Sequence, residues 1–213
     1  MMKKIFSLMI CALAVCTIIT AQTMNIRVGQ VTYQFPAEQA GVMNYTNGNT
    51  LTVMDKVFAL TEVEDMYVNE TSVEDNTVTV VYNENSAAVT VAGNVAKYLT
   101  ISVSGAHVNI AQSDDLQQEI TYTLSGSSAD GEFYMSGSYK ATVELNGLTL
   151  TNTNPVASGA AVHIQNGKRI KVKVMSLPHS IPLIPLPSRA TRAVMVQTTM
   201  VSIKTSKTPK IPC

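Results

Sequence analysis

Three carboxylates lie close together in the middle of the sequence: Asp114, Asp115 and Glu119. Ca²⁺ binds carboxylate and carbonyl oxygens at turns, so these residues could supply two or three ligands of a calcium site. The alternative interpretation is a solvated loop between two strands. Asp130 and the pair Asn152 and Asn154 are weaker candidates, because turn residues explain them equally simply.

Other chemistry-bearing residues lack the spacing that a metal site or a catalytic triad needs. His107 and His163 lie inside β segments without an H-E-x-x-H or His-x-His pattern, so zinc is disfavoured and both are expected to be packed or solvent-facing. Ser125, Ser136 and Ser158 each precede a glycine, but none lies in a G-x-S-x-G elbow, so we interpret them as corners. No G-x-G-x-x-G or P-loop occurs.

The elements that position these residues are short strands. Alternation of apolar and polar residues begins after Gln22, and short strands continue to Val174. The stretch through Val68 contains no helical periodicity longer than about two turns, and a short helical turn is expected only at Glu62 to Asp65. Small and polar turn residues separate the strands, which indicates sharp corners. The sequence therefore predicts an all-β protein.

Two internal echoes suggest stacked coils. Leu124-Ser125-Gly126-Ser127 recurs as Met135-Ser136-Gly137-Ser138, and the run 143–147 has a counterpart about 20 residues later at 162–167. A solenoid would explain them, and a sandwich with repeated hairpins is the alternative. If the echoes mark equivalent places in successive coils, Asn146 and Asn166 would form an asparagine ladder.

Charge and cysteine content divide the chain into regions. The formal net charge is zero, but residues 22–174 contain all 15 acidic residues and eight basic ones, which gives −7, whereas residues 175–213 contain five basic residues and no acid. An acidic central region disfavours nucleic acid as a partner. Residues 22–212 contain no cysteine, which excludes disulfides and thiolate metal sites there.

The N-terminal residues are typical of a signal peptide. Lys3 and Lys4 precede an apolar run that ends near Ala21, which predicts export and cleavage there, and no membrane span afterwards. Cys16, in Leu13-Ala14-Val15-Cys16, leaves a lipoprotein as the less favoured alternative.

The C-terminal residues differ from everything before them. Six of the eight prolines follow Val174, and the run 181–187 cannot lie inside a sheet because proline donates no ladder hydrogen bond. We favour a frameshift that replaced the rest of the domain; a genuine Pro-rich basic tail is the alternative.

The predicted organisation is a signal peptide (1–21), a small antiparallel β module (22–75), a partial β-helix domain (76–174) and the tail (175–213).

Four runs between Val78 and Val174 carry a resemblance to a known family: 119–126, 131–135, 142–152 and 159–172. This stretch resembles the opening coils of carbohydrate-binding domains with a pectate-lyase-like right-handed parallel β-helix. The resemblance implies binding of plant polysaccharide, such as pectin-like chains, assisted by calcium. Ca²⁺ would supply the counter-charge that a uronate needs on an acidic protein.

The sequence favours a secreted or surface protein that binds carbohydrate without catalysis. A polysaccharide lyase is the first alternative, but its base would be an arginine beside calcium-binding aspartates, and only Arg27 and Arg169 precede the tail. We interpret the run 168–173 that contains Arg169 as a basic outward face. A structural or adhesion protein is the second alternative. The oligomeric state and the sugar-binding residues are not predicted.

Overall fold

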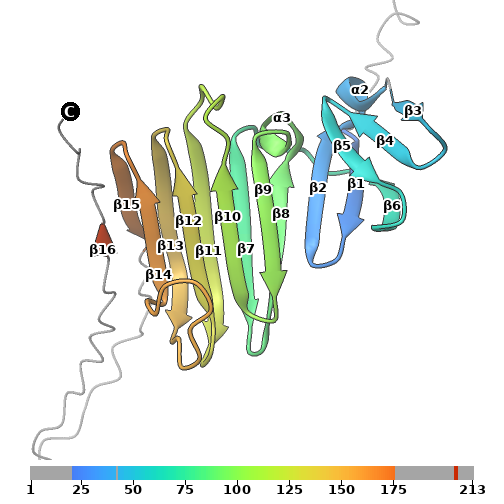
Figure 1. The fold of residues 1–213 in the computed structure, drawn as a ribbon. Coiled ribbons are helices and arrows are strands. Elements are labelled where there is room, and N and C mark those ends of the chain that lie inside the picture. The colour runs from blue at the N-terminus through green and yellow to red at the C-terminus, as the bar shows by residue number, and fades with distance from the viewer. Residues whose placement is uncertain (1–20, 42, 176–203, 206–213) are drawn as a thin grey trace, which may run out of the picture.

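The computed structural model describes residues 21–41, 43–175 and 204–205 (Figure 1). The predicted signal peptide apart from Ala21, Cys16 of the lipoprotein alternative, and all of the predicted tail except Met175 and residues 204–205 lie outside the described residues. Within the described part, no helix is long and apolar enough to cross a membrane.

The described chain is almost entirely β, which confirms the predicted fold class. The first strands are β1 (Thr23–Val28), β2 (Val31–Pro36), β3 (Asn44–Thr46), β4 (Thr50–Val53), β5 (Lys56–Ala59), β6 (Val63–Asn69), β7 (Thr77–Asn83) and β8 (Ser86–Ala92). The later strands are β9 (Leu99–Ser104), β10 (His107–Gln112), β11 (Ile120–Ser128), β12 (Glu132–Gly137), β13 (Ala141–Leu150), β14 (Val162–Asn166), β15 (Ile170–Met175) and β16 (Lys204–Thr205). Two short helices, α2 (Ala37–Ala40) and α3 (Gly93–Ala96), were not expected.

These strands form three sheets. The long sheet has eight strands in the order β15-β13-β11-β7-β8-β2-β1-β6, and the short sheet has five in the order β16-β14-β12-β10-β9. The small sheet contains β3, β4 and β5 and is antiparallel, as predicted for the N-terminal module. Strands β1, β2 and β6 of that module belong to the long sheet, because β2 pairs in parallel with β8.

From β10 onward the chain alternates between the long and short sheets. Strands β11, β13 and β15 stack in parallel in the long sheet, and β10, β12, β14 and β16 stack in parallel in the short sheet. Ile120 pairs with Ala141 and Ala141 with Ile170, so one coil takes 21 residues and the next 29. This winding agrees with a solenoid rather than with repeated hairpins, but β7–β8 and β9–β10 are antiparallel. A right-handed β-helix is not confirmed and stays a prediction.

The core lies between the long and short sheets. Alternate residues of each strand point inward, so Tyr122 and Leu124 from β11 meet Phe133 and Met135 from β12, and all four are fully buried. The rings of Tyr122 and Phe133 make an edge-to-face contact with centroids 6.0 Å apart. The side chains between these inward positions form the two outer faces.

Three sequence interpretations are wrong. Both echoes join strands of opposite sheets: 124–127 lies in β11 and 135–138 begins in β12, while 143–147 lies in β13 and 162–167 begins in β14. Asn146 therefore faces solvent beside Ser125, Asn166 pairs with Gly137, and no asparagine ladder forms between them. Residues 62–65 lead into the strand β6 instead of a helical turn.

Candidate functional site

The C-terminal ends of β10, β12 and β14 form a groove on the short sheet. Its lining is polar apart from one aromatic ring, and its cavity volume is about 460 Å³. We call it the Tyr134 groove; it is lined by Gln112, Asp114, Tyr134, Ser136, Gly137, Ser138, Gln165, Asn166 and Gly167.

Strand register explains why these side chains gather. In parallel strands, equivalent positions lie side by side, so Asn109, Tyr134 and His163 form one outward row. Ser136 and Gln165 are neighbours in the next row. The groove is therefore a product of stacking, since its residues come from three separate strands.

Tyr134 is held in position by the coil that follows it. Its hydroxyl donates a hydrogen bond to Gln165 Oε1 over 2.6 Å, and its ring meets the His163 ring edge to face with centroids 5.1 Å apart. Both contacts fix the ring while leaving the side chain half-exposed. A partly exposed, immobilised aromatic ring is a common feature of ligand sites.

Gln112 forms the floor of the groove. Its side chain is 8% exposed, and Nε2 donates to the buried hydroxyl of Tyr122 over 2.9 Å, whereas Oε1 has no partner among the described residues. A Cβ on Gly137 would lie 2.0 Å from Gln112 Oε1, so any larger residue there would require the Gln112 side chain to move. Gln112 thus leaves one buried acceptor unpaired at the groove, an arrangement that usually has a functional or solvent explanation.

The predicted calcium ligands make contacts with different sheets. Asp114 is exposed and lines the Tyr134 groove, and Asp115 is exposed in the turn after β10. Glu119 instead accepts a hydrogen bond from Thr142 over 2.8 Å and lies 3.9 Å from Lys171, on the outer face of the long sheet. The Thr142 hydroxyl, followed by Lys171, Arg169 and Lys140, lowers the pKa of Glu119 despite some opposing desolvation.

Within the described residues, no group of three His, Cys, Asp or Glu is placed to hold a metal ion. The structure therefore gives no support to a cluster of Asp114, Asp115 and Glu119 as a complete ligand set. A calcium site stays a prediction, with Asp114 as its one carboxylate in the groove.

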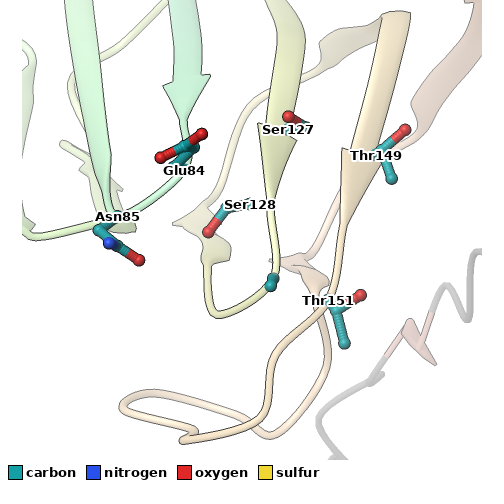
Figure 2. A pocket seen from close by; sticks show the side chains of 7 residues that line it. Glu84, Asn85, Ser127, Ser128, Thr149 and Thr151 are labelled. Carbon is teal, nitrogen blue, oxygen red and sulfur yellow. The ribbon is translucent and has the colours of Figure 1, made fainter.

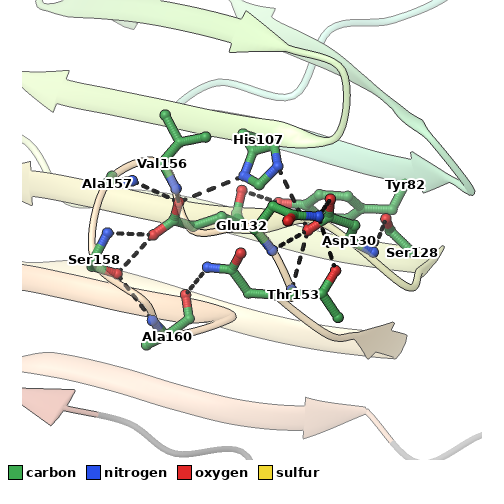
Figure 3. Close-up of polar contacts among 12 residues, drawn as sticks. Tyr82, His107, Ser128, Asp130, Glu132, Thr153, Val156, Ala157, Ser158 and Ala160 are labelled. Atoms are coloured by element: carbon green, nitrogen blue, oxygen red, sulfur yellow. Dashed lines mark hydrogen bonds and ion pairs between the residues drawn. The ribbon is translucent and has the colours of Figure 1, made fainter.

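At the opposite end of these strands, two acids hold the loop between β13 and β14 (Figure 3). Glu132 accepts backbone hydrogen bonds from Val156, Ala157 and Ser158 over 3.2, 2.9 and 2.7 Å, and a fourth from the Ser158 hydroxyl over 2.8 Å. Asp130 accepts from the backbone of Thr153 and from the backbone and side-chain amides of Asn154. We call Asp130, Glu132 and residues 153–158 the acid clamp.

The electrostatics of the acid clamp follow from its donors. Hydrogen bonds from Asn154 lower the pKa of Asp130 to about 2. Burial acts to raise the pKa of Glu132, but the amides of the loop and the Ser158 hydroxyl outweigh it, so the pKa is lowered. His107 lies 3.6 Å from Glu132 and 3.9 Å from Asp130, so it adds a third coil to the clamp.

Sequence reasoning missed Glu132 altogether. It alternates with Phe133 and Met135 as an outward-facing strand residue would, yet it is only 1% exposed because the loop covers it. Asp130 and Asn154, which were weak calcium candidates, bind each other instead. No pattern in the sequence predicts that the loop around Val156, 24 residues after Glu132, folds back over β12.

A second hollow lies at the ends of β7, β11 and β13 (Figure 2). Its cavity volume is about 480 Å³, and it is lined by Glu84, Asn85, Ser127, Ser128, Ala129, Thr149 and Thr151. Short hydroxyl side chains predominate and no aromatic ring contributes. It has no immobilised ring, so it is the weaker candidate for a ligand site.

Fold and groove together define an all-β protein of stacked parallel strands with a polar groove at the strand ends. No protein-family model matches the chain, and searches of curated proteins and of solved structures found no similar protein. The resemblance to β-helical carbohydrate-binding domains therefore gains no support from these comparisons, and function must be argued from the groove.

Proposed function

We propose that this is an exported, non-enzymatic carbohydrate-binding protein whose ligand lies in the Tyr134 groove. The observation that carries the proposal is the Tyr134 ring, fixed by Gln165 and His163 in an otherwise polar groove. An aromatic face can pack against the C–H face of a sugar ring. Amides and hydroxyls on either side can bond to the sugar hydroxyls.

The shape of the surface favours a linear chain. The outer face of the short sheet carries Ser102, Asn109, Tyr134 and His163 in one row across four neighbouring strands. An extended polysaccharide can lie along such a row and contact several coils at once. The proposed ligand class is therefore a linear plant polysaccharide.

Charge decides between an acidic and a neutral chain. The lining of the groove contains one carboxylate, Asp114, and no lysine or arginine. A pectin-like chain would need a cation between its uronates and Asp114, which is the role proposed for Ca²⁺. A neutral chain would bind without metal.

Calorimetric titration with pectic and neutral oligosaccharides, each with calcium and with EDTA, tests the proposal. Tyr134→Ala is expected to weaken binding at least about tenfold, equivalent to about 1.4 kcal/mol. Tyr45→Ala removes an exposed tyrosine of the small sheet and is the matched control. Asp114→Asn should abolish only the calcium-dependent component.

Each negative outcome has a distinct meaning. Failure to bind any glycan would contradict the proposal and favour a structural or adhesion protein. Release of unsaturated product from pectin would favour the lyase alternative. Equal loss in both tyrosine variants would show that the groove is not the site.

A further inference from the structure

The long sheet ends in β6 on one side and β15 on the other (Figure 1), and each of these strands carries exposed apolar side chains. At one end, Met66 and Val68 of β6 pair with the buried Ile26 and Met24, yet are 42% and 58% exposed. At the other end, Val172 and Val174 of β15 pair with the buried Val143 and Leu145, yet are 38% and 76% exposed.

The two ends carry opposite charge. Glu62, Glu64, Asp65 and Glu70 lie in or beside β6, whereas Lys168, Arg169, Lys171 and Lys173 lie in or beside β15. Asp65 pairs with the outward Arg27, while Lys171 and Lys173 lie near Glu119 and Glu144 on the outer face. In β15 the lysines therefore line the outer face and the valines the core face. In β6 only Asp65 is on the outer side of the strand opposite to Met66 and Val68, and Glu64 lies 3.7 Å from Arg27.

In the part of the chain that the structure describes, both end strands also have a free edge. Within the described residues, β6 pairs only with β1, and β15 pairs only with β13. A free edge presents unpaired N–H and C=O groups that can bind another strand. Each end strand therefore combines a free edge, two exposed apolar side chains and several residues of one charge.

We propose that copies of this chain associate head to tail, with β15 of one copy adding to β6 of the next. The long sheet then continues across the contact, with Val172 and Val174 extending the row of Met66 and Val68. The basic residues of β15 then lie close to the acidic residues of β6. Because the two surfaces differ, the interface is heterologous and repeats along an open series.

The chain's own C-terminal residues are a poorer match for the end at β15. Residues 176–213 contain five basic residues and no acid, so they would add positive charge to an already basic strand. Their described part, β16, pairs with β14 in the short sheet and not with β15. An acidic β6 from a second copy supplies the missing charge.

Sedimentation velocity over a range of concentrations tests the proposal with two variants, Met66→Asp and Val174→Asp. Each places a charge in one apolar pair at an exposed position, so each should fold, which circular dichroism checks. Each alone should self-associate at least about tenfold more weakly than the unaltered chain. Raised salt should also weaken the association of the unaltered chain.

Mixing the two variants is the experiment that distinguishes head-to-tail association from other kinds of self-association. The Met66→Asp chain keeps an intact β15 and the Val174→Asp chain keeps an intact β6, so an equimolar mixture should form dimers. Association should stop there because both altered ends carry an aspartate. Two results overturn the proposal: an unaltered chain that stays monomeric at all concentrations, or a mixture that behaves as its separate components do.

Discussion

Glu132 shows how one buried residue can organise a region that sequence patterns describe only as a strand. Its carboxylate satisfies four donors of a loop that has no regular structure of its own. Charged acceptors form stronger hydrogen bonds than neutral ones, so burial of this acid is compensated. The loop then covers the strand and shapes the surface next to His107.

Replacing Glu132 by Gln should destabilise the protein. One acceptor oxygen becomes an NH₂ group facing N–H donors, which should lower the free energy of unfolding by about 2–3 kcal/mol. Urea denaturation measures the change. Glu144→Gln, which removes a partly exposed partner of Lys173, should cost no more than about 1 kcal/mol; equal losses would contradict the role given to Glu132.

The acid clamp should loosen in acid. The pKa values of Asp130 and Glu132 are lowered in the folded state, so their contribution is complete above the ordinary carboxyl pKa values of about 4 and is lost as pH falls toward the folded values, about 2 for Asp130. Hydrogen exchange of the amides of Thr153 and Asn154, which donate to Asp130, should accelerate between about pH 4 and pH 2 after correction for intrinsic rates. Unchanged protection of these amides in that range would contradict the prediction.

At the scale of elements, strands were predictable and their partners were not. The alternation of apolar residues identified β7 to β15, because a half-buried strand must place every second side chain in the core. The helical turn expected at 62–65 does not form, because pairing with β1 decides the conformation of this segment. The two sequence echoes do not mark equivalent places in successive coils for a related reason. Strands of similar sequence occur in both sheets, so similarity does not show which sheet a strand joins.

Gly126 marks a place where one element constrains another. It has φ +85°, and a Cβ there would lie 2.0 Å from the carbonyl oxygen of Tyr82 in the neighbouring strand. Gly126→Ala should cost about 3 kcal/mol or more, since strain adds to a backbone clash. Gly147→Ala is the matched control, because Gly147 has φ +64° with open space around it and should cost about 1–2 kcal/mol. Thermal unfolding of both variants compares them, and equal costs would mean that the clash is relieved.

At the scale of the whole molecule, one sheet connects segments that composition had separated. The sequence predicted a module at 22–75 and a domain at 76–174, but pairing of β2 with β8 carries the long sheet across that boundary. The buried core is likewise continuous from Met24 to Ile164. Both observations favour a single cooperative unit.

Unfolding should therefore occur in one transition. Phe58→Trp reports on the N-terminal part and Phe133→Trp on the stacked coils, and both residues are buried. Their fluorescence transitions in urea should coincide. Two separate midpoints would instead support two independent domains.

Much of this protein follows from its sequence alone. Alternating apolar residues, small polar corners and the absence of helical periodicity determine an all-β chain, because side-chain direction in a strand is a local property. Only the tertiary structure decides which strands become neighbours, and therefore that Gln112, Tyr134 and Gln165 form a groove while Asp114 and Glu119 face different sheets. Pairing depends on register and stacking between residues 20 to 30 positions apart, and the local pattern does not encode that choice.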